Sequence, residues 1–170
     1  MRNRGFTLAE LLVAMTIGAI LLAQAAPGLV RHRGEAALRT AASQTLAALQ
    51  LARRLALARG QSVTVCPSAD GAACGFGGST WLLFANAPGG TDGHREAADE
   101  LLQSWEVPAG ILVTGTRGYA AFQPQAGTAT TVTFQFCHRA VPGEAVSIVI
   151  SQTGRPRVTR STSGATCQTG

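Results

Sequence analysis

Apolar residues follow three successive patterns along the chain. A nearly uninterrupted apolar run extends from Leu11 to Val30. Over residues 35–59 the apolar positions recur at spacings of three and four, which predicts an amphipathic helix. Beyond Gly60 the apolar residues alternate in short segments bounded by Gly, Pro, Asn or Asp, which predicts strands. The pattern therefore predicts a long N-terminal helix followed by a β-rich head.

The apolar run is long enough to cross a membrane. At about 1.5 Å per residue, about 20 helical residues span roughly 30 Å of hydrocarbon. Pro27 removes one backbone donor, so we expect it to bend the helix rather than end it. Gly60 follows Arg59 as a C-terminal stop signal. The apolar stripe expected to pack on the head consists of Leu38, Ala42, Leu46, Leu49, Ala52 and Ala56.

The head is expected to contain antiparallel sheets, because no alternation of strands and helices is present. The fold class is therefore α+β, with an apolar helix up to residue 30, its amphipathic continuation over 31–59 and a head over 60–170. The predicted strands are 61–66, 80–85, 101–107, 111–114, 119–122, 131–137, 145–151 and 157–160. The aromatic residues expected in the core are Trp81, Phe84, Trp105, Phe122, Phe134 and Phe136.

Composition changes this picture little. The chain has 170 residues, so a membrane helix of about 30 leaves about 140, enough for one head domain. The formal net charge is +5, and all 14 basic residues are Arg. Without Arg2 and Arg4 the net charge would be +3, which is compatible with nucleic acid without requiring it.

The four cysteines all follow the apolar run. The basic leader places the N-terminus in the cytoplasm, so the head faces an oxidising compartment and two disulfides are expected. Of the three possible pairings, we favour Cys66–Cys74, which closes a short Gly-rich loop, and Cys137–Cys167, which ties the tail to a strand. Metal ligation is the alternative, but the spacing contains no Cys-x-x-Cys.

The first ten residues combine a basic leader with a single acid. Arg2 and Arg4 precede Gly5, and the sequence Phe-Thr-Leu-Ala-Glu over 6–10 leads into the apolar run. An ionised Glu inside hydrocarbon costs roughly 2.5–3.5 kcal/mol on insertion scales, so an acid at this position indicates a function.

These residues resemble the leader of type IV prepilins and type II secretion pseudopilins. The resemblance implies that a prepilin peptidase cleaves after Gly5, that Phe6 becomes the N-methylated terminus, and that Glu10 guides assembly with other pilins. It thereby divides the N-terminal part into a leader, 1–5, and a transmembrane helix, 6–30. In a filament the Glu10 carboxylate would neutralise the Phe6 ammonium of a neighbouring subunit, so that two groups costly in lipid are tolerated as a pair.

Two simpler interpretations of the N-terminus compete. Ala23-Gln24-Ala25 offers a signal-peptide cleavage site, although an h-region does not normally carry an acid such as Glu10. The second alternative is a plain single-pass membrane anchor, which needs an apolar run of the same length as the one observed.

The order of elements is similar to that of the minor pilins and pseudopilins that include FimT and the secretion pseudopilin GspH. Within that group, Gly154-Arg155-Pro156-Arg157 resembles the Gly-Arg-x-Arg motif of FimT-type minor pilins, which bind DNA during natural transformation. The resemblance implies a DNA-binding role for this tetrapeptide.

The chemistry of the tetrapeptide supports that role. If residues 155–157 are extended, as Pro156 favours, Arg155 and Arg157 point the same way and can grip phosphates, while Gly154 permits a tight turn. We expect Arg160 and Arg139 to widen this patch. Two to four phosphate contacts predict a slope of log affinity on log salt of about −2 to −4 and no sequence preference. The alternative is that these arginines only keep a strand edge soluble.

The sequence thus predicts a type IV minor pilin that binds duplex DNA for uptake, anchored in the inner membrane with a periplasmic head and extracellular once assembled in the pilus. The alternatives are a type II secretion pseudopilin and a minor pilin that only primes assembly or mediates adhesion. No catalytic elbow, triad ordering or phosphate loop is present, so an enzyme, a cofactor or a metal site is not expected.

Overall fold

The structure is a computed structural model that describes residues 7–125 and 128–165, without the side chains of 24–27 and 162–165. The chain forms two compact units, residues 1–33 and 34–170. All buried hydrophobic side chains that the structure describes lie between Leu38 and Ile150. Residues 34–170, called the head below, therefore have a hydrophobic core of their own.

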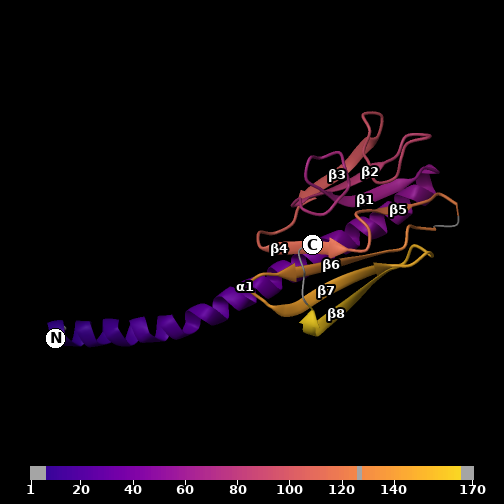
Figure 1. The fold of residues 1–170 in the computed structure, drawn as a ribbon. Coiled ribbons are helices and arrows are strands. Elements are labelled where there is room, and N and C mark those ends of the chain that lie inside the picture. Colours follow the sequence, from indigo (N-terminus) through magenta and orange to yellow (C-terminus); the bar gives the residue numbers. More distant parts are fainter. Residues whose placement is uncertain (1–6, 126–127, 166–170) are drawn as a thin grey trace. The chain divides into compact units, whose positions relative to one another are not determined.

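Helix α1 spans Leu8–Arg59 without a break at Pro27 (Figure 1). It is rich in Ala and Leu, the strongest helix formers. It ends where predicted, because Gly60 has a positive φ of 66° and its N–H donates to the Ala56 carbonyl at 3.1 Å. One 18-residue window of α1 has a mean hydropathy of 1.9, so by length and composition the helix can cross a membrane.

Two four-stranded sheets form the rest of the head, and every strand pair in them is antiparallel. The first sheet has the order β3-β2-β1-β5 and the second β4-β6-β7-β8 (Figure 1). The strands are β1 (Val63–Ser68), β2 (Thr80–Ala85), β3 (Glu100–Glu106), β4 (Ile111–Gly115), β5 (Ala120–Phe122), β6 (Val132–His138), β7 (Gly143–Ile150) and β8 (Pro156–Ala165).

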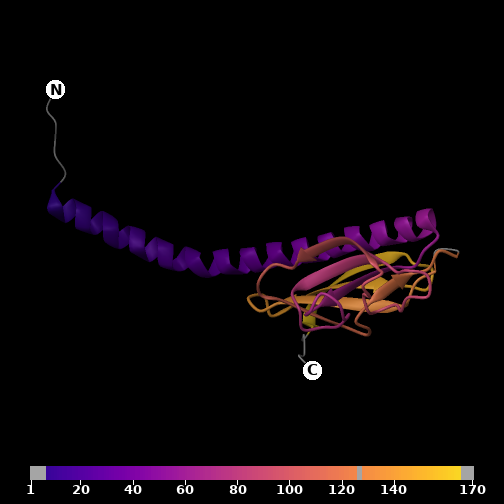
Figure 2. The ribbon, with the colours of Figure 1, turned by 90° about the horizontal axis from the view of Figure 1, so that it is seen from above.

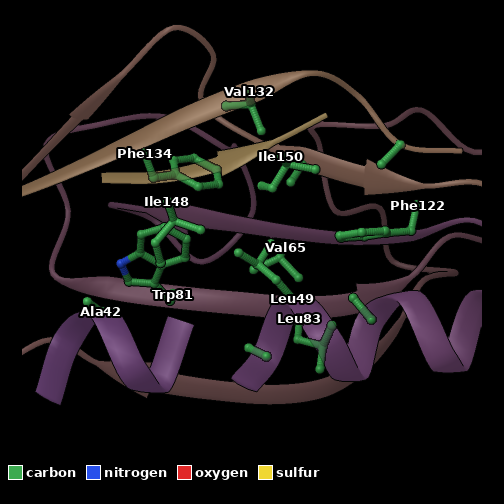
Figure 3. Close-up of a cluster of buried hydrophobic side chains, with 14 of the residues drawn as sticks. Ala42, Leu49, Val65, Trp81, Leu83, Phe122, Val132, Phe134, Ile148 and Ile150 are labelled. Carbon is green, nitrogen blue, oxygen red and sulfur yellow. The ribbon is translucent and has the colours of Figure 1, made fainter. Parts of the chain in front are cut away.

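One core joins the helix to both sheets. Figure 2 shows the second half of α1 lying along the strands, and Figure 3 shows Ala42 and Leu49 of this helix packed near side chains of both sheets. The core residues from the sheets include Val65, Trp81, Leu83, Phe122, Val132, Phe134, Ile148 and Ile150. The predicted helical stripe is confirmed, with five of its six positions buried and Leu46 partly buried against them.

The predicted strands all occur, with ends displaced by a few residues. Two aromatic assignments need correction. Phe84 is buried in a separate small cluster with Cys66 and Leu82, because it alternates with Leu83 and so lies on the other face of β2. Trp105 is only partly buried, since it lies on the edge strand β3, where it stacks on Trp81 at 5.8 Å.

The predicted Cys66–Cys74 disulfide is present, with a Cα–Cα distance of 5.4 Å. It closes the loop that follows β1, where the Asp70 side chain accepts bonds from the backbone N–H groups of Ala72 and Ala73. These two bonds, with one from the Ser68 hydroxyl, lower the pKa of Asp70. Cys137 is also disulfide-bonded, and its predicted partner Cys167 lies outside the described residues.

Candidate nucleic-acid interface

A tight turn connects β7 to β8 and presents the predicted tetrapeptide. Gly154 has a positive φ of 68°, a conformation that other L-residues rarely adopt. Its N–H donates to the Ser151 carbonyl at 2.8 Å, and the Ser151 and Thr153 hydroxyls bond each other at 2.9 Å. The prediction that Gly154 permits a tight turn is therefore confirmed, and β8 begins two residues later at Pro156.

Arg155 and Arg157 are both exposed at this turn. Arg157 pairs with Val149 across the two strands. The neighbouring pair is Ile150 with Pro156, and the side chain of Ile150 is buried in the core. Because side chains alternate along a strand, Arg157 lies on the outer face of the second sheet, the face turned away from the core. Neither arginine has an ion pair within residues 7–125 and 128–165. Their charges are therefore not neutralised by the described part of the head.

Apart from the arginines, the outer face around this turn is uncharged and mostly polar. Next to Arg157 on β8 and β7 lie Val149, Ser147 and Thr159, and β6 continues the face with Thr133 and Gln135. The sequences of β4, β6, β7 and β8 contain one acid, Glu144, at the far end of β7. A phosphate approaching Arg155 and Arg157 therefore meets no carboxylate from these strands near the turn.

Arg160 lies in a different environment. It pairs with Val146, whose side chain is buried, so strand alternation places Arg160 on the face toward α1. There it lines a pocket with Glu35, Arg39 and Glu144. Two carboxylates in this pocket offset its positive charge. The structure thus does not bring Arg160 together with Arg155 and Arg157.

Arg139 lies at the opposite end of the second sheet. It is in the turn between β6 and β7, and its N–H donates to the Gly110 carbonyl at 3.3 Å. Figure 1 shows the β6–β7 and β7–β8 turns at opposite ends of the sheet. The eight residues of β7 span roughly 26 Å at about 3.3 Å each, so Arg139 does not widen the patch as predicted.

The β6–β7 turn is also where α1 enters the head. A Cβ atom at Gly34 would lie 2.6 Å from Val141 Cγ2 and 2.8 Å from His138 Nδ1. Only glycine allows this close approach of helix and turn. The Arg155–Arg157 turn is therefore at the end of the head that is farther from Gly34.

The N-terminal site contains a feature that was not predicted from the sequence. Thr7 Oγ1 and the Thr7 backbone N–H both donate to Glu10 Oε2 at 2.9 Å, and the Glu10 N–H donates to Thr7 Oγ1 at 3.3 Å. This is a capping box, for which the Thr-x-x-Glu spacing is the sequence signal. Glu10 therefore caps its own helix. Gly5 and Phe6 lie outside the described residues.

Comparison with known families agrees with this fold and N-terminus. The family model of the type II transport protein GspH matches residues 41–154. The chain belongs to the GspH family. The prokaryotic N-terminal methylation motif matches residues 1–23. No curated protein sequence matches the chain.

Two kinds of solved structure are similar to this GspH-family chain. The type IV minor pilin FimU of Pseudomonas aeruginosa shares 21% identity with a TM-score of 0.55, covering 75% of this chain and 90% of FimU. The minor pseudopilin EpsH of the type 2 secretion system of Vibrio cholerae shares 14% identity with a TM-score of 0.53, covering 72% of this chain and 95% of EpsH. These identities show a common fold, and association with other pilins follows from the family. The family match ends at Gly154, immediately before the arginine pair.

Proposed function

We propose that this GspH-family protein is a type IV minor pilin that binds extracellular duplex DNA, without sequence preference, for uptake in natural transformation. The observation that carries the proposal is the arginine pair at the β7–β8 turn. Arg155 and Arg157 are exposed, have no ion pair in the described part of the chain, and lie on a face without nearby strand carboxylates. Guanidinium groups in this setting suit phosphate oxygens.

The proposed pathway begins at the inner membrane. A prepilin peptidase cleaves after Gly5, Phe6 is N-methylated, and the apolar part of α1 joins the pilus together with other pilins. The head then presents Arg155 and Arg157 to DNA outside the cell, and filament retraction brings the bound DNA inward. Because one head makes few phosphate contacts, binding by a single subunit is weak, and several basic sites along a filament would add avidity.

The proposal is tested with the head, residues 34–170, in a mobility-shift titration against duplex DNA at low salt. Arg155→Gln with Arg157→Gln removes two phosphate contacts, and we expect affinity to fall about tenfold or more. The matched control is Arg139→Gln with Arg54→Gln, which removes the same charge from two other exposed positions. Equal losses in the two double variants would show that only net charge matters and would remove the assigned site.

A second candidate function is supported by the family match itself. The matched model describes a type II transport protein, and the EpsH fold is similar. In this function the head would contact other pseudopilins in a secretion apparatus and would need no phosphate contact. A wild-type head that fails to bind DNA at low salt, while the full-length protein co-purifies with pseudopilins, would favour this candidate.

We also propose that Glu10 serves two successive roles. In the subunit the carboxylate caps α1 through Thr7, and in the filament it neutralises the Phe6 ammonium of a neighbouring subunit. Glu10→Ala should be inserted and cleaved but incorporated poorly into filaments, whereas Thr7→Ala removes only the cap. Pilus fractions probed for the protein distinguish the two, and normal incorporation of Glu10→Ala would contradict the pairing role.

A further inference from the structure

We infer that the DNA site does not end at the β7–β8 turn but crosses the outer face of the second sheet to Arg117, which forms its opposite margin. This inference rests on the proposed DNA binding. It adds Arg117 as a contact residue, the outer face of the second sheet as the path of the DNA, and a preference for duplex over single-stranded DNA. Arg117 is exposed, follows β4 by two residues, and has no ion pair in the described ranges 7–125 and 128–165.

Strand register and hydrogen bonds place Thr116, the residue before Arg117, in one row with Arg157 across the sheet. Residues 116–118 form a bend after the end of β4 at Gly115, so strand alternation does not assign Arg117 to the inner face. Arg157 pairs with Val149, and Val149 pairs with Thr133. Thr133 is in turn bonded to Thr116 in both directions: the Thr116 N–H donates to the Thr133 carbonyl at 3.1 Å, and the Thr133 N–H donates to Thr116 Oγ1 at 3.1 Å. Arg117 is the next residue. Four backbone segments thus lie side by side, with the arginine pair on the first, Arg117 on the last, and β7 and β6 between them.

The separation suits a duplex groove. Neighbouring strands are about 4.8 Å apart, so three steps across the sheet separate the two margins by about 14 Å. The major groove of B-DNA is about 12 Å wide. Arginine groups at the two margins can therefore reach phosphates on both sides of one groove.

The surface between the margins fits a phosphate backbone better than unpaired bases. Its described side chains are short hydroxyls and amides with one apolar residue, namely Thr133, Gln135, Ser147, Val149, Thr159 and Thr114. Hydroxyl and amide groups donate to phosphate and sugar oxygens. The aromatic residues of β6, Phe134 and Phe136, are buried on the other face. Single-strand binding depends on exposed aromatic side chains for base stacking, so this face favours a duplex.

The test uses the head with a duplex of about 20 base pairs and with one of its strands alone, titrated at several salt concentrations. Arg117→Gln should weaken duplex binding about threefold to tenfold and reduce the salt slope by about 0.9, the value for one lost phosphate contact. Arg117→Lys should retain most of the affinity, because it keeps the charge. Arg139→Gln is the matched control, since it removes the same charge from the opposite end of the sheet.

The outcomes separate this inference from the proposed function. If Arg155→Gln with Arg157→Gln weakens binding but Arg117→Gln behaves like Arg139→Gln, the path to Arg117 is wrong and the arginine pair stands. If the single strand binds as tightly as the duplex, the duplex preference is wrong. If the wild-type head binds neither DNA, both the inference and the proposed function are overturned.

Discussion

Arg157 and Arg160 lie three residues apart on the same strand but in opposite electrostatic environments. Arg157 lies on the outer face, beside uncharged residues, and has no ion pair in the described part of the chain. Arg160 lies on the face toward α1, in a pocket that also contains Glu35 and Glu144. The difference arises because side chains alternate along a strand, so two residues that are three positions apart point to opposite faces. Local arginine density is therefore a poor guide to a phosphate site, and strand register is a better one.

Among the tests of this comparison, charge reversal at Arg157 and at Arg160 has the largest expected effect. Arg157→Glu replaces a phosphate contact by repulsion, and we expect duplex affinity to fall by about thirtyfold at low salt. Arg160→Glu changes net charge equally, but in a pocket with two carboxylates, and should lower DNA affinity by no more than about threefold. Mobility-shift titrations measure both. A larger loss for Arg160→Glu than for Arg157→Glu would reverse the assignment of faces.

The turn glycines at the two ends of β7 provide a second, smaller test. Gly154 and Gly143 both have positive φ, 68° and 86°. Substitution by Ala should cost about 1–2 kcal/mol of stability at either position. Only Gly154→Ala should also weaken DNA binding, by about fivefold, because it alone holds the arginine turn. Chemical denaturation and DNA titration of both variants check this. Equal DNA affinities in the two variants would show that the turn geometry is irrelevant to binding.

Removal of the carboxylates near Arg160 should give the smallest effect and partly abolish the difference between the faces. Glu35→Gln with Glu144→Gln leaves Arg39 and Arg160 in the pocket without their acids. We expect duplex affinity to rise about twofold, because the loss of two negative charges makes the long-range field more positive. The matched control is Glu96→Gln with Glu106→Gln, two exposed acids in and beside the first sheet. A tenfold rise only in the pocket variant would show that this pocket is a phosphate site held inactive by its acids.

The sequence was sufficient to predict the elements of the fold. Apolar spacing located both the membrane-length run and the stripe from Leu38 to Ala56, and alternation located every strand. The Cys66–Cys74 bridge was predictable because the two residues are close in sequence. Pairing between strands was not predictable, since it depends on side-chain contacts between segments far apart in the chain.

The candidate site was only half predictable for the same reason. The local sequence Gly-Arg-Pro-Arg contains its own turn and its own alternation, so Arg155 and Arg157 could be grouped without the fold. Arg139 is separated from this pair by the length of β7. The position of Arg117 relative to the second sheet depends on the hydrogen bonds between Thr116 and Thr133, which join segments far apart in the sequence. At the N-terminus, by contrast, the Thr7–Glu10 cap is a local feature that its spacing alone could have predicted.

The most direct test of the central claim is an NMR titration of the head, labelled with nitrogen-15, with duplex DNA, followed at the Nε–H signals of the arginine side chains. We expect the signals of Arg155 and Arg157 to shift or broaden first, while those of Arg139 and Arg160 stay unchanged at the same DNA ratio. Perturbation of Arg139 and Arg160 with silent Arg155 and Arg157 would contradict this claim.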